Sequence, residues 1–119
     1  NDLEKKIIYN NPIIVYFAFD SSSLGKYEKN NIDKFINIAY KIKYSHLLVE
    51  GHTDSSGLKQ YNLELSKKRA LKVKDYLIKH GIKKNTITTN AFGENKLFIY
   101  TDDGVKEKKN RRVEISIIE

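Results

Sequence analysis

The sequence predicts a two-layer α/β sandwich (an α+β fold) with the element order βαβαββ. Four short segments are rich in β-branched and aromatic residues, which favours strands, and two longer segments between them show apolar residues at helical spacing. With 119 residues and no cysteine, the chain is long enough for one domain to bury a core without disulfides. Both helices are expected on one face of the sheet.

The first half of the chain contains two predicted strands separated by one helix. Residues 1–11 are expected to be a polar lead-in, and Pro12 marks the start of the domain, residues 12–119. The run from Ile13 to Phe19 is almost continuously apolar, so we expect a buried strand, covered on both faces or central in its sheet. A second strand follows from His46. The helix between them is predicted from the apolar stripe Ile32, Phe35, Ile36, Ala39 and Ile42.

The second half contains one long helix and two more strands. The helix is predicted from about residue 58 to residue 80 and ends in cations followed by Gly81, which suits a left-handed cap. A third strand is expected over 86–92, then a long polar connection over 93–109. The last strand, 112–118, alternates, so one face packs and the other meets water or a cover. The expected core positions are Leu65, Ala70, Val73, Leu77, Val113, Ile115 and Ile117, and Arg112 is expected to point to solvent.

The net charge of +7 comes from 22 basic and 15 acidic residues and predicts attraction to polyanions such as nucleic acid, anionic lipid or a cell-wall polymer. Most of these charges are expected on a solvated surface. No apolar run approaches the ~20 residues that span a bilayer. The chain starts at Asn1 and shows no signal peptide, so we expect an exported protein to be represented by a trimmed piece. Any membrane attachment is expected through segments absent from this chain.

The segment from Glu50 to Gly57 joins the second strand to the long helix and carries Asp54, at a position where α/β sheets bind ligands. Asn62 and Arg69 are seven residues apart, so they share one helix face, and the long arginine leans back toward this loop. Such a site suits a zwitterion, with Asp54 for an ammonium, Arg69 for a carboxylate and Asn62 for the atoms between. The alternative is a structural salt bridge between Asp54 and Arg69.

An enzyme is not expected. His52 has no metal-ligand spacing with the two other histidines, and cysteine is absent. Ser55 and Ser56 are explained as turn formers and need no nucleophilic role. The sequence therefore predicts no catalytic residue, no metal site and no cofactor.

Motifs at three places resemble the OmpA/Pal/MotB-type peptidoglycan-binding domain, and the likeness covers roughly Pro12 to Ile117. The resemblance implies a mixed sheet of four strands in the order 1-4-2-3 with strand 4 antiparallel. In that topology Asp20, Asp54 and Asn110-Arg111 meet on one edge, as a binding site requires. The motifs are Val15-Tyr16-Phe17-Ala18-Phe19-Asp20; then Gly51-His52-Thr53-Asp54 with Gly57, Tyr61-Asn62, Leu65-Ser66 and Arg69-Ala70; and Asn110-Arg111-Arg112-Val113-Glu114-Ile115.

The resemblance implies non-covalent binding of peptidoglycan through the meso-diaminopimelate of its stem peptide, with Asp54 on the ammonium and Arg69 on the carboxylate. It also implies that the domain anchors an outer-membrane protein or lipoprotein to the cell wall, on the periplasmic face of the bacterial outer membrane. Other envelope proteins are possible partners. The candidate ligand-binding residues are Asp54, Arg69, Asn62, Thr53, Asp20, Phe19 and Arg111.

Several of these candidates have a second interpretation. Thr53 is either a ligand contact or a turn residue, and Phe19 suits the core better than a ligand. Asp20 could cap the first helix, although the resemblance places it at the pocket rim. Arg111 is expected to order the site or to meet an acidic group of the ligand.

The sequence departs from the family pattern in the loop before Asn110. Leu97 stands where many members have proline, and the segment from Gly104 is longer than usual, with Val105 in place of an arginine. The longer segment favours the Pal type within the family.

Two other classes remain as alternatives. A small basic nucleic-acid-binding domain would need aromatic residues exposed on the sheet, whereas most tyrosines and phenylalanines here fall at core-like positions. The other is a protein-interaction module that keeps the fold without the ligand.

Overall fold

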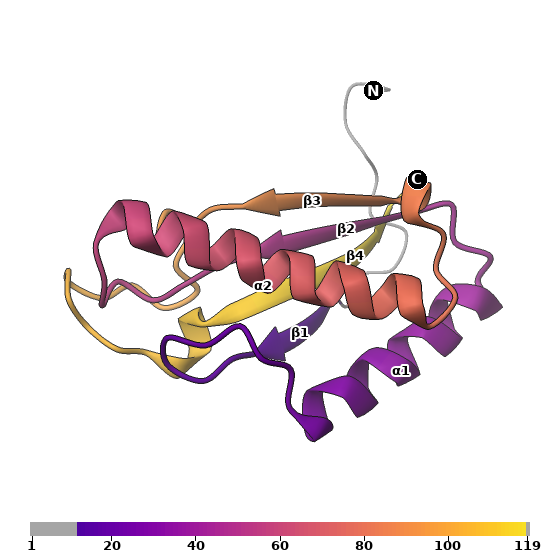
Figure 1. Cartoon of the computed structure of the whole chain (residues 1–119), viewed down its shortest axis with the longest axis horizontal. Helices are drawn as coiled ribbons and strands as arrows, with labels where there is room; N and C mark the ends of the chain where they lie inside the picture. The colour runs from indigo at the N-terminus through magenta and orange to yellow at the C-terminus, as the bar shows by residue number, and fades with distance from the viewer. Residues whose placement is uncertain (1–11, 119) are drawn as a thin grey trace.

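The computed structural model describes residues 12–118 and shows a four-stranded sheet with two helices (Figure 1). The sheet order is β1-β4-β2-β3, with β4 antiparallel to both of its neighbours and β2 parallel to β3, so the predicted fold is confirmed. The lead-in predicted over 1–11 lies outside the described residues. Neither helix of the described chain has the length and apolar character to cross a membrane. The elements are β1 (Ile13–Tyr16), α1 (Lys26–Lys41), β2 (His46–Gly51), α2 (Lys59–Lys79), β3 (Ile87–Ala91) and β4 (Arg112–Ile118), with short 3-10 turns at Lys84–Thr86 and Lys108–Asn110.

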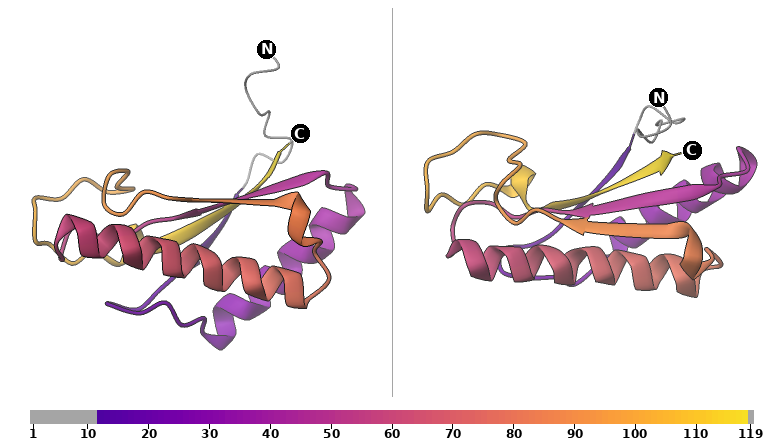
Figure 2. Two further views of the ribbon diagram at one scale, coloured as in Figure 1. Left: turned by 45° about the horizontal axis from the view of Figure 1, so that its top comes forward. Right: turned by 90° about the horizontal axis from the view of Figure 1, so that it is seen from above.

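The core lies against one face of the sheet. Val49 of β2 is paired with Ile115 of β4, which places both side chains on the same face, and both are fully buried. Both helices contribute to the same apolar cluster, so both cover this face (Figure 2). Their buried residues confirm the predicted stripes, except that Ile42 follows the end of α1 and is 41% exposed. The helix residues in the cluster are Ile32, Phe35, Ile36 and Ala39 from α1, and Ala70, Val73 and Leu77 from α2.

The prediction that the first strand is central or covered on both faces is wrong. β1 is an edge strand of four residues, paired with β4, and Val15 is its buried residue. The backbone contact between the two segments continues one residue past the strand, where Phe17 N donates to Arg111 O at 3.0 Å, and the chain then turns through Asp20, which has a φ of 53°. Phe19, beyond the strand, is 49% exposed.

β2 ends in close contact with the first half of α2. A Cβ on Gly51 would overlap the carbonyl oxygen of Ser66, so the missing side chain allows the helix to lie directly on the strand. Ser66 Oγ also accepts a hydrogen bond from Gly93 N at 2.9 Å. This helix turn therefore holds the end of β2 and the beginning of the β3–β4 connection together.

The long β3–β4 connection is fixed by Asn110, whose buried side-chain amide donates to Ile99 O and accepts from Ile99 N, both at 2.8 Å. The connection also covers Arg112, so the prediction that this side chain points to solvent is wrong. Arg112 is buried, donates to Lys96 O at 3.1 Å, and lies over the ring of Phe98.

Candidate ligand-binding site at the ends of the strands

Three connections meet at one end of the sheet, where β1, β2 and β3 end and β4 begins (Figure 1). The N-terminal half of α2 lies beside them. A hollow of about 170 Å³ opens between these segments. Its lining residues are Phe19, Asp20, Asp54, Ser56, Gly57, Tyr61, Asn62, Leu65, Arg69 and Arg111.

Arg69 is completely buried, and backbone carbonyl groups fix its guanidinium. Nε donates to Ser21 O at 2.8 Å, Nη1 to His52 O at 2.9 Å and Nη2 to Ala18 O at 3.2 Å. The guanidinium also lies 5.2 Å from the ring centre of Phe17. Burial lowers the pKa of Arg69 to about 10, opposed by the charge of Asp54, so the side chain stays cationic at neutral pH. Arg69 therefore holds a fixed positive charge at the hollow.

Asp54 follows β2 and accepts four hydrogen bonds. Oδ1 accepts from the backbone and hydroxyl groups of Ser56, and Oδ2 accepts from Glu107 N at 3.1 Å and from Arg111 Nη1 at 3.2 Å. Burial alone would raise the pKa of Asp54, but the hydrogen bonds from Ser56, Glu107 and Arg111 outweigh it, and the pKa lies below its ordinary value. Asp54 is therefore a fixed carboxylate at neutral pH.

The rim of the hollow carries a second acid and two aromatic rings. The hydroxyl of Tyr61 donates to Asp20 Oδ1, which joins α2 to the β1–α1 connection. Lys106 Nζ lies 4.1 Å from the ring centre of Phe19, so the β3–β4 connection also reaches this rim. Asp20 does not cap the first helix, because α1 begins after Gly25 without a side-chain cap.

Asn62 and Thr53 contribute to the site in different ways. Asn62 lines the hollow while its Nδ2 donates to Asp54 O and Gly57 O, each at 3.2 Å, and to Glu94 Oε1 at 2.9 Å. Thr53 is buried, and its hydroxyl donates to Asp54 O at 2.8 Å. The side chain of Thr53 is outside the lining of the hollow, which agrees with its interpretation as a turn residue.

The structure thus brings six of the seven candidate residues to one hollow and leaves Thr53 behind it. Whether they bind a ligand stays a prediction. The alternative of a direct Asp54–Arg69 salt bridge is not seen: the ion-pair partner of Asp54 within residues 12–118 is Arg111. Phe19 lines the rim, so its interpretation as a core residue is wrong.

Ser56, Tyr61 and Leu65 also line the hollow, although the sequence predicts Ser56 as a turn former and Leu65 as a core residue and places none of the three in the site. Tyr61 precedes Arg69 by about two helical turns and Leu65 precedes it by about one. Helical spacing therefore could have placed Tyr61, Leu65 and Arg69 on one side of α2. Ser56 follows Asp54 by two residues, the spacing at which an aspartate accepts from the backbone in a turn.

The described contacts show neither a metal site nor a nucleophile with its base. Residues 12–118 contain no group of three or more His, Asp or Glu side chains placed to hold a metal ion. The hydroxyl of Ser55 contacts Thr101 Oγ1 at 2.9 Å and Asp102 O at 2.7 Å, which ties down the β3–β4 connection. The hollow instead offers two guanidinium groups and two carboxylates, a pattern that complements a ligand carrying both charges.

The fold and the hollow define a two-layer α/β domain with a mixed-charge site at the ends of its strands. The model of the OmpA family matches residues 16–111, and the chain belongs to that family. Outer membrane protein A of Bordetella avium is 34% identical over 113 residues, which are 95% of this chain and 57% of the relative.

A second relative and a solved structure also support membership in the OmpA family. A peptidoglycan-associated lipoprotein of Buchnera aphidicola is 32% identical over 98 residues, which are 82% of this chain and 57% of the relative. The solved OmpA-like domain of a Francisella tularensis protein superposes with a TM-score of 0.80 at 26% identity, covering 97% of this chain and 81% of that one. The chain thus spans a little over half the length of the curated relatives, and the family resemblance seen in the motifs is confirmed.

Proposed function

We propose that this domain binds peptidoglycan non-covalently, through the meso-diaminopimelate of the stem peptide, and so holds an outer-membrane protein or lipoprotein to the cell wall. Membership in the OmpA family and similarity to peptidoglycan-associated lipoproteins support the polymer as ligand. The relative named as an outer membrane protein supports a place in the cell envelope. The periplasmic face of the outer membrane is part of the proposal.

One observation carries the choice of ligand. The hollow combines Arg69, a cation fixed by three backbone carbonyls, with the carboxylates of Asp54 and Asp20. A free amino acid end group bears one carboxylate and one ammonium, which these charges complement. At about 170 Å³ the hollow is smaller than the roughly 300–1,000 Å³ of pockets for drug-sized ligands. One end group therefore enters, and the rest of the polymer stays outside.

Each charged residue has a role in this proposal. Arg69 holds the carboxylate through the N–H groups that its carbonyl contacts leave free. Asp54 holds the ammonium, which must share Oδ2 with Arg111 Nη1 or displace it, because the carboxylate already accepts four hydrogen bonds. A displaced Arg111 guanidinium would then be available to the ligand carboxylate. Asp20 and Phe19 border the entrance.

The affinity expected for one site is modest. A charge-assisted hydrogen bond contributes about 1.5–3 kcal/mol net, and part of this is lost in displacing Arg111. Anchoring to a polymer does not need a tight single site, because many weak sites act together.

Calorimetric titration of the whole chain with stem peptides tests the ligand directly. A peptide with meso-diaminopimelate at its third position should bind, and the same peptide with lysine should bind at least about tenfold more weakly, because lysine lacks the second carboxylate. Equal binding of the two peptides would show that the hollow does not distinguish meso-diaminopimelate from lysine.

Sedimentation with purified sacculi tests the site residues. Asp54→Asn and Arg69→Lys should each reduce binding, since the first removes the carboxylate charge and the second the two-pronged guanidinium. Asp75→Asn is the matched control, an exposed acid of α2 outside the lining of the hollow. If both site variants, folded by circular dichroism, sediment like the control, the hollow is not the binding site.

The nucleic-acid alternative receives less support. On the sheet face opposite the core, Glu50 of β2 is paired with Glu114 of β4. Burial, followed by the charge of Glu114, raises the pKa of Glu50, and the nearby cations of Lys96 and Arg112 oppose this rise. Two acids in the middle of this face disfavour a phosphate backbone. Salt-sensitive binding of a single-stranded oligonucleotide at physiological ionic strength would revive this alternative.

A further inference from the structure

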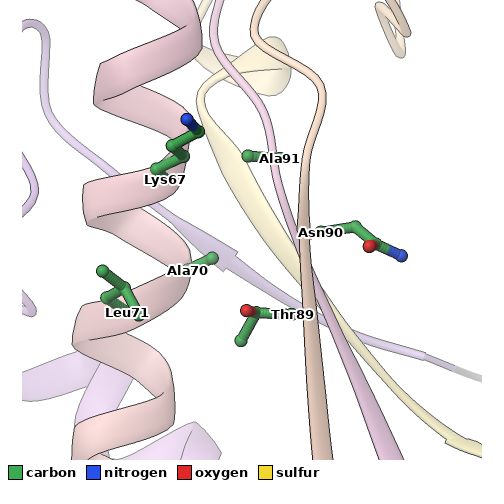
Figure 3. A pocket seen from close by; sticks show the side chains of 6 residues that line it. All are labelled: Lys67, Ala70, Leu71, Thr89, Asn90 and Ala91. Atoms are coloured by element: carbon green, nitrogen blue, oxygen red, sulfur yellow. The ribbon is translucent and has the colours of Figure 1, made fainter.

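A second and larger hollow, of about 320 Å³, lies between α2 and the edge strand β3 and shares no lining residue with the first. Figure 3 shows Lys67, Ala70 and Leu71 on the helix side and Thr89 and Ala91 pointing toward them from β3, while Asn90 points away. We infer that this groove and the open edge of β3 dock an extended acidic segment of a partner polypeptide, which adds a strand to the sheet. This goes beyond the proposed binding of peptidoglycan.

The backbone of β3 offers the hydrogen bonds for such a strand. β3 lies at the end of the sheet order and pairs with β2 alone. In a parallel ladder alternate residues point to the same neighbour, and Phe92 N donates to Gly51 O at 3.0 Å on the β2 side. Thr89 and Ala91 therefore direct their backbone groups to the open edge. Within residues 12–118 no hydrogen bond from another element reaches either of them.

The same two residues shape the groove. Their side chains are small and face α2, where Ala70 is buried and Leu71 is 48% exposed. An incoming strand would alternate its side chains, so every second one would enter this space and cover Leu71. Backbone pairing with pockets for alternate side chains is how strand addition combines affinity with selectivity.

The charge around the groove defines the partner. Residues 64–94, which include the groove residues, contain seven lysines and Arg69 against three acids, Glu64, Asp75 and Glu94, and Lys67 Nζ lies 3.4 Å from Glu64 Oε2 in an exposed ion pair. Lys67 lines the groove itself. An acidic segment is attracted to this surface, whereas a second copy of the chain would bring lysines against lysines. Lysines beside an edge also discourage pairing between copies.

The test uses a fluorescein-labelled, end-blocked peptide of eight alternating glutamate and valine residues, with a lysine–valine peptide for comparison. The acidic peptide should bind saturably to the whole chain, and the basic one should not. Amide hydrogen exchange at Thr89 and Ala91 should be fast in the free protein and slow in the complex. The amides of Thr88 and Asn90, already in the ladder with β2, should be slow in both.

Variants of α2 separate groove docking from diffuse attraction. Lys67→Glu and Leu71→Glu should each weaken binding of the acidic peptide by about tenfold. Lys72→Glu makes the same charge change at an exposed lysine outside the groove and should leave binding unchanged. Sedimentation with sacculi should be the same for all three variants and the parent, which keeps this test independent of the first hollow.

Several results would overturn the inference. Absent or non-saturable binding, equal binding of the basic peptide, or unchanged exchange at Thr89 and Ala91 would each do so. An equal loss with Lys67→Glu and Lys72→Glu would show general attraction to polyanions. Displacement of the peptide by phosphatidylglycerol vesicles, with the same dependence on both lysines, would assign the surface to anionic lipid instead.

Discussion

Arg111 donates a hydrogen bond from Nη1 to Oδ2 of Asp54 at 3.2 Å and thereby joins the start of β4 to the loop after β2. The same guanidinium donates from Nε to Phe17 O at 3.0 Å, just beyond the end of β1. One side chain thus connects the ends of three neighbouring strands. The first hollow depends on this connection, because Asp54 and Arg111 both line it.

Replacing Arg111 should loosen this connection without unfolding the domain. In Arg111→Ala, Asp54 keeps its donors from Ser56 and Glu107 but loses a charged one, so its pKa should rise from the lowered value of the parent. The free energy of unfolding should fall by about 1–3 kcal/mol. NMR titration of the Asp54 carboxyl and urea denaturation measure the two effects. Arg111→Lys keeps the positive charge, so its Asp54 pKa and its free energy of unfolding should lie between those of the parent and of Arg111→Ala. An unchanged pKa of Asp54 in Arg111→Ala would contradict this role of Arg111.

The secondary structure was accessible to sequence reasoning because it depends on local patterns. The alternation over 112–118 gave the bounds of β4, and the helical stripe gave the buried side of α2. The same patterns misplaced residues whose surroundings come from distant segments. Phe19 continues an apolar run yet lies beyond the strand. The chain turns there, and the carbonyl groups of Ala18 and Ser21 accept hydrogen bonds from Arg69.

The sequence predicted which residues meet at the site, but it could not predict their hydrogen-bond partners. Helical spacing predicted that Arg69 reaches the loop after β2, and its Nη1 does bind His52 O there. Spacing could not show that Asp54 is paired with Arg111, 57 residues further along the chain. Nor could it show that Arg112 is covered by the β3–β4 connection, since that loop has no periodic pattern.

Arg69 should be essential to stability as well as to binding. The side chain is fully buried and donates to three carbonyl groups. Arg69→Ala takes away the donor to Ser21 O and to His52 O and one of the two donors to Ala18 O, and it opens a cavity, so we expect a loss of about 3–5 kcal/mol in the free energy of unfolding. Arg69→Lys can still donate to some of these carbonyl groups, so its free energy of unfolding should fall less. Urea denaturation compares the two, and equal stability of Arg69→Ala and the parent would contradict this role.

Gly51→Ala should separate α2 from β2. The added methyl group would overlap the carbonyl oxygen of Ser66, and backbone atoms there cannot rotate away. We expect a loss of about 1–3 kcal/mol or more from this overpacking, measured as a lower midpoint in urea. Gly25→Ala is the matched control, because a Cβ there meets no atom within 4 Å. A parent-like midpoint for Gly51→Ala would show that the helix is not seated on this glycine.

His52 is the site neighbour whose protonation should limit stability in mild acid. The ring is buried and stacks on Phe92 with centres 5.3 Å apart, and within residues 12–118 its Nδ1 makes no hydrogen bond. Burial, followed by the positive charge of Arg112, lowers the pKa of His52 to about 4 from an ordinary value of 6.5. The folded protein therefore holds this ring neutral, while the unfolded chain takes up a proton below pH 6.5.

Because the unfolded state binds more protons, the parent should lose roughly 2–3 kcal/mol through His52 as the pH falls from 6.5 to about 4. His52→Phe keeps a ring on Phe92 and removes both the titrating group and the unpaired Nδ1, so its free energy of unfolding should fall less over this range. The lowered pKa of Asp54 changes the free energy of unfolding only as the pH falls below the ordinary Asp value of 3.8, which is outside the range from pH 6.5 to about 4. Urea denaturation at half-unit pH steps measures the difference, with the exposed His80→Gln as control. Parallel pH profiles of the parent and His52→Phe would mean that the buried ring already carries its proton in the folded state.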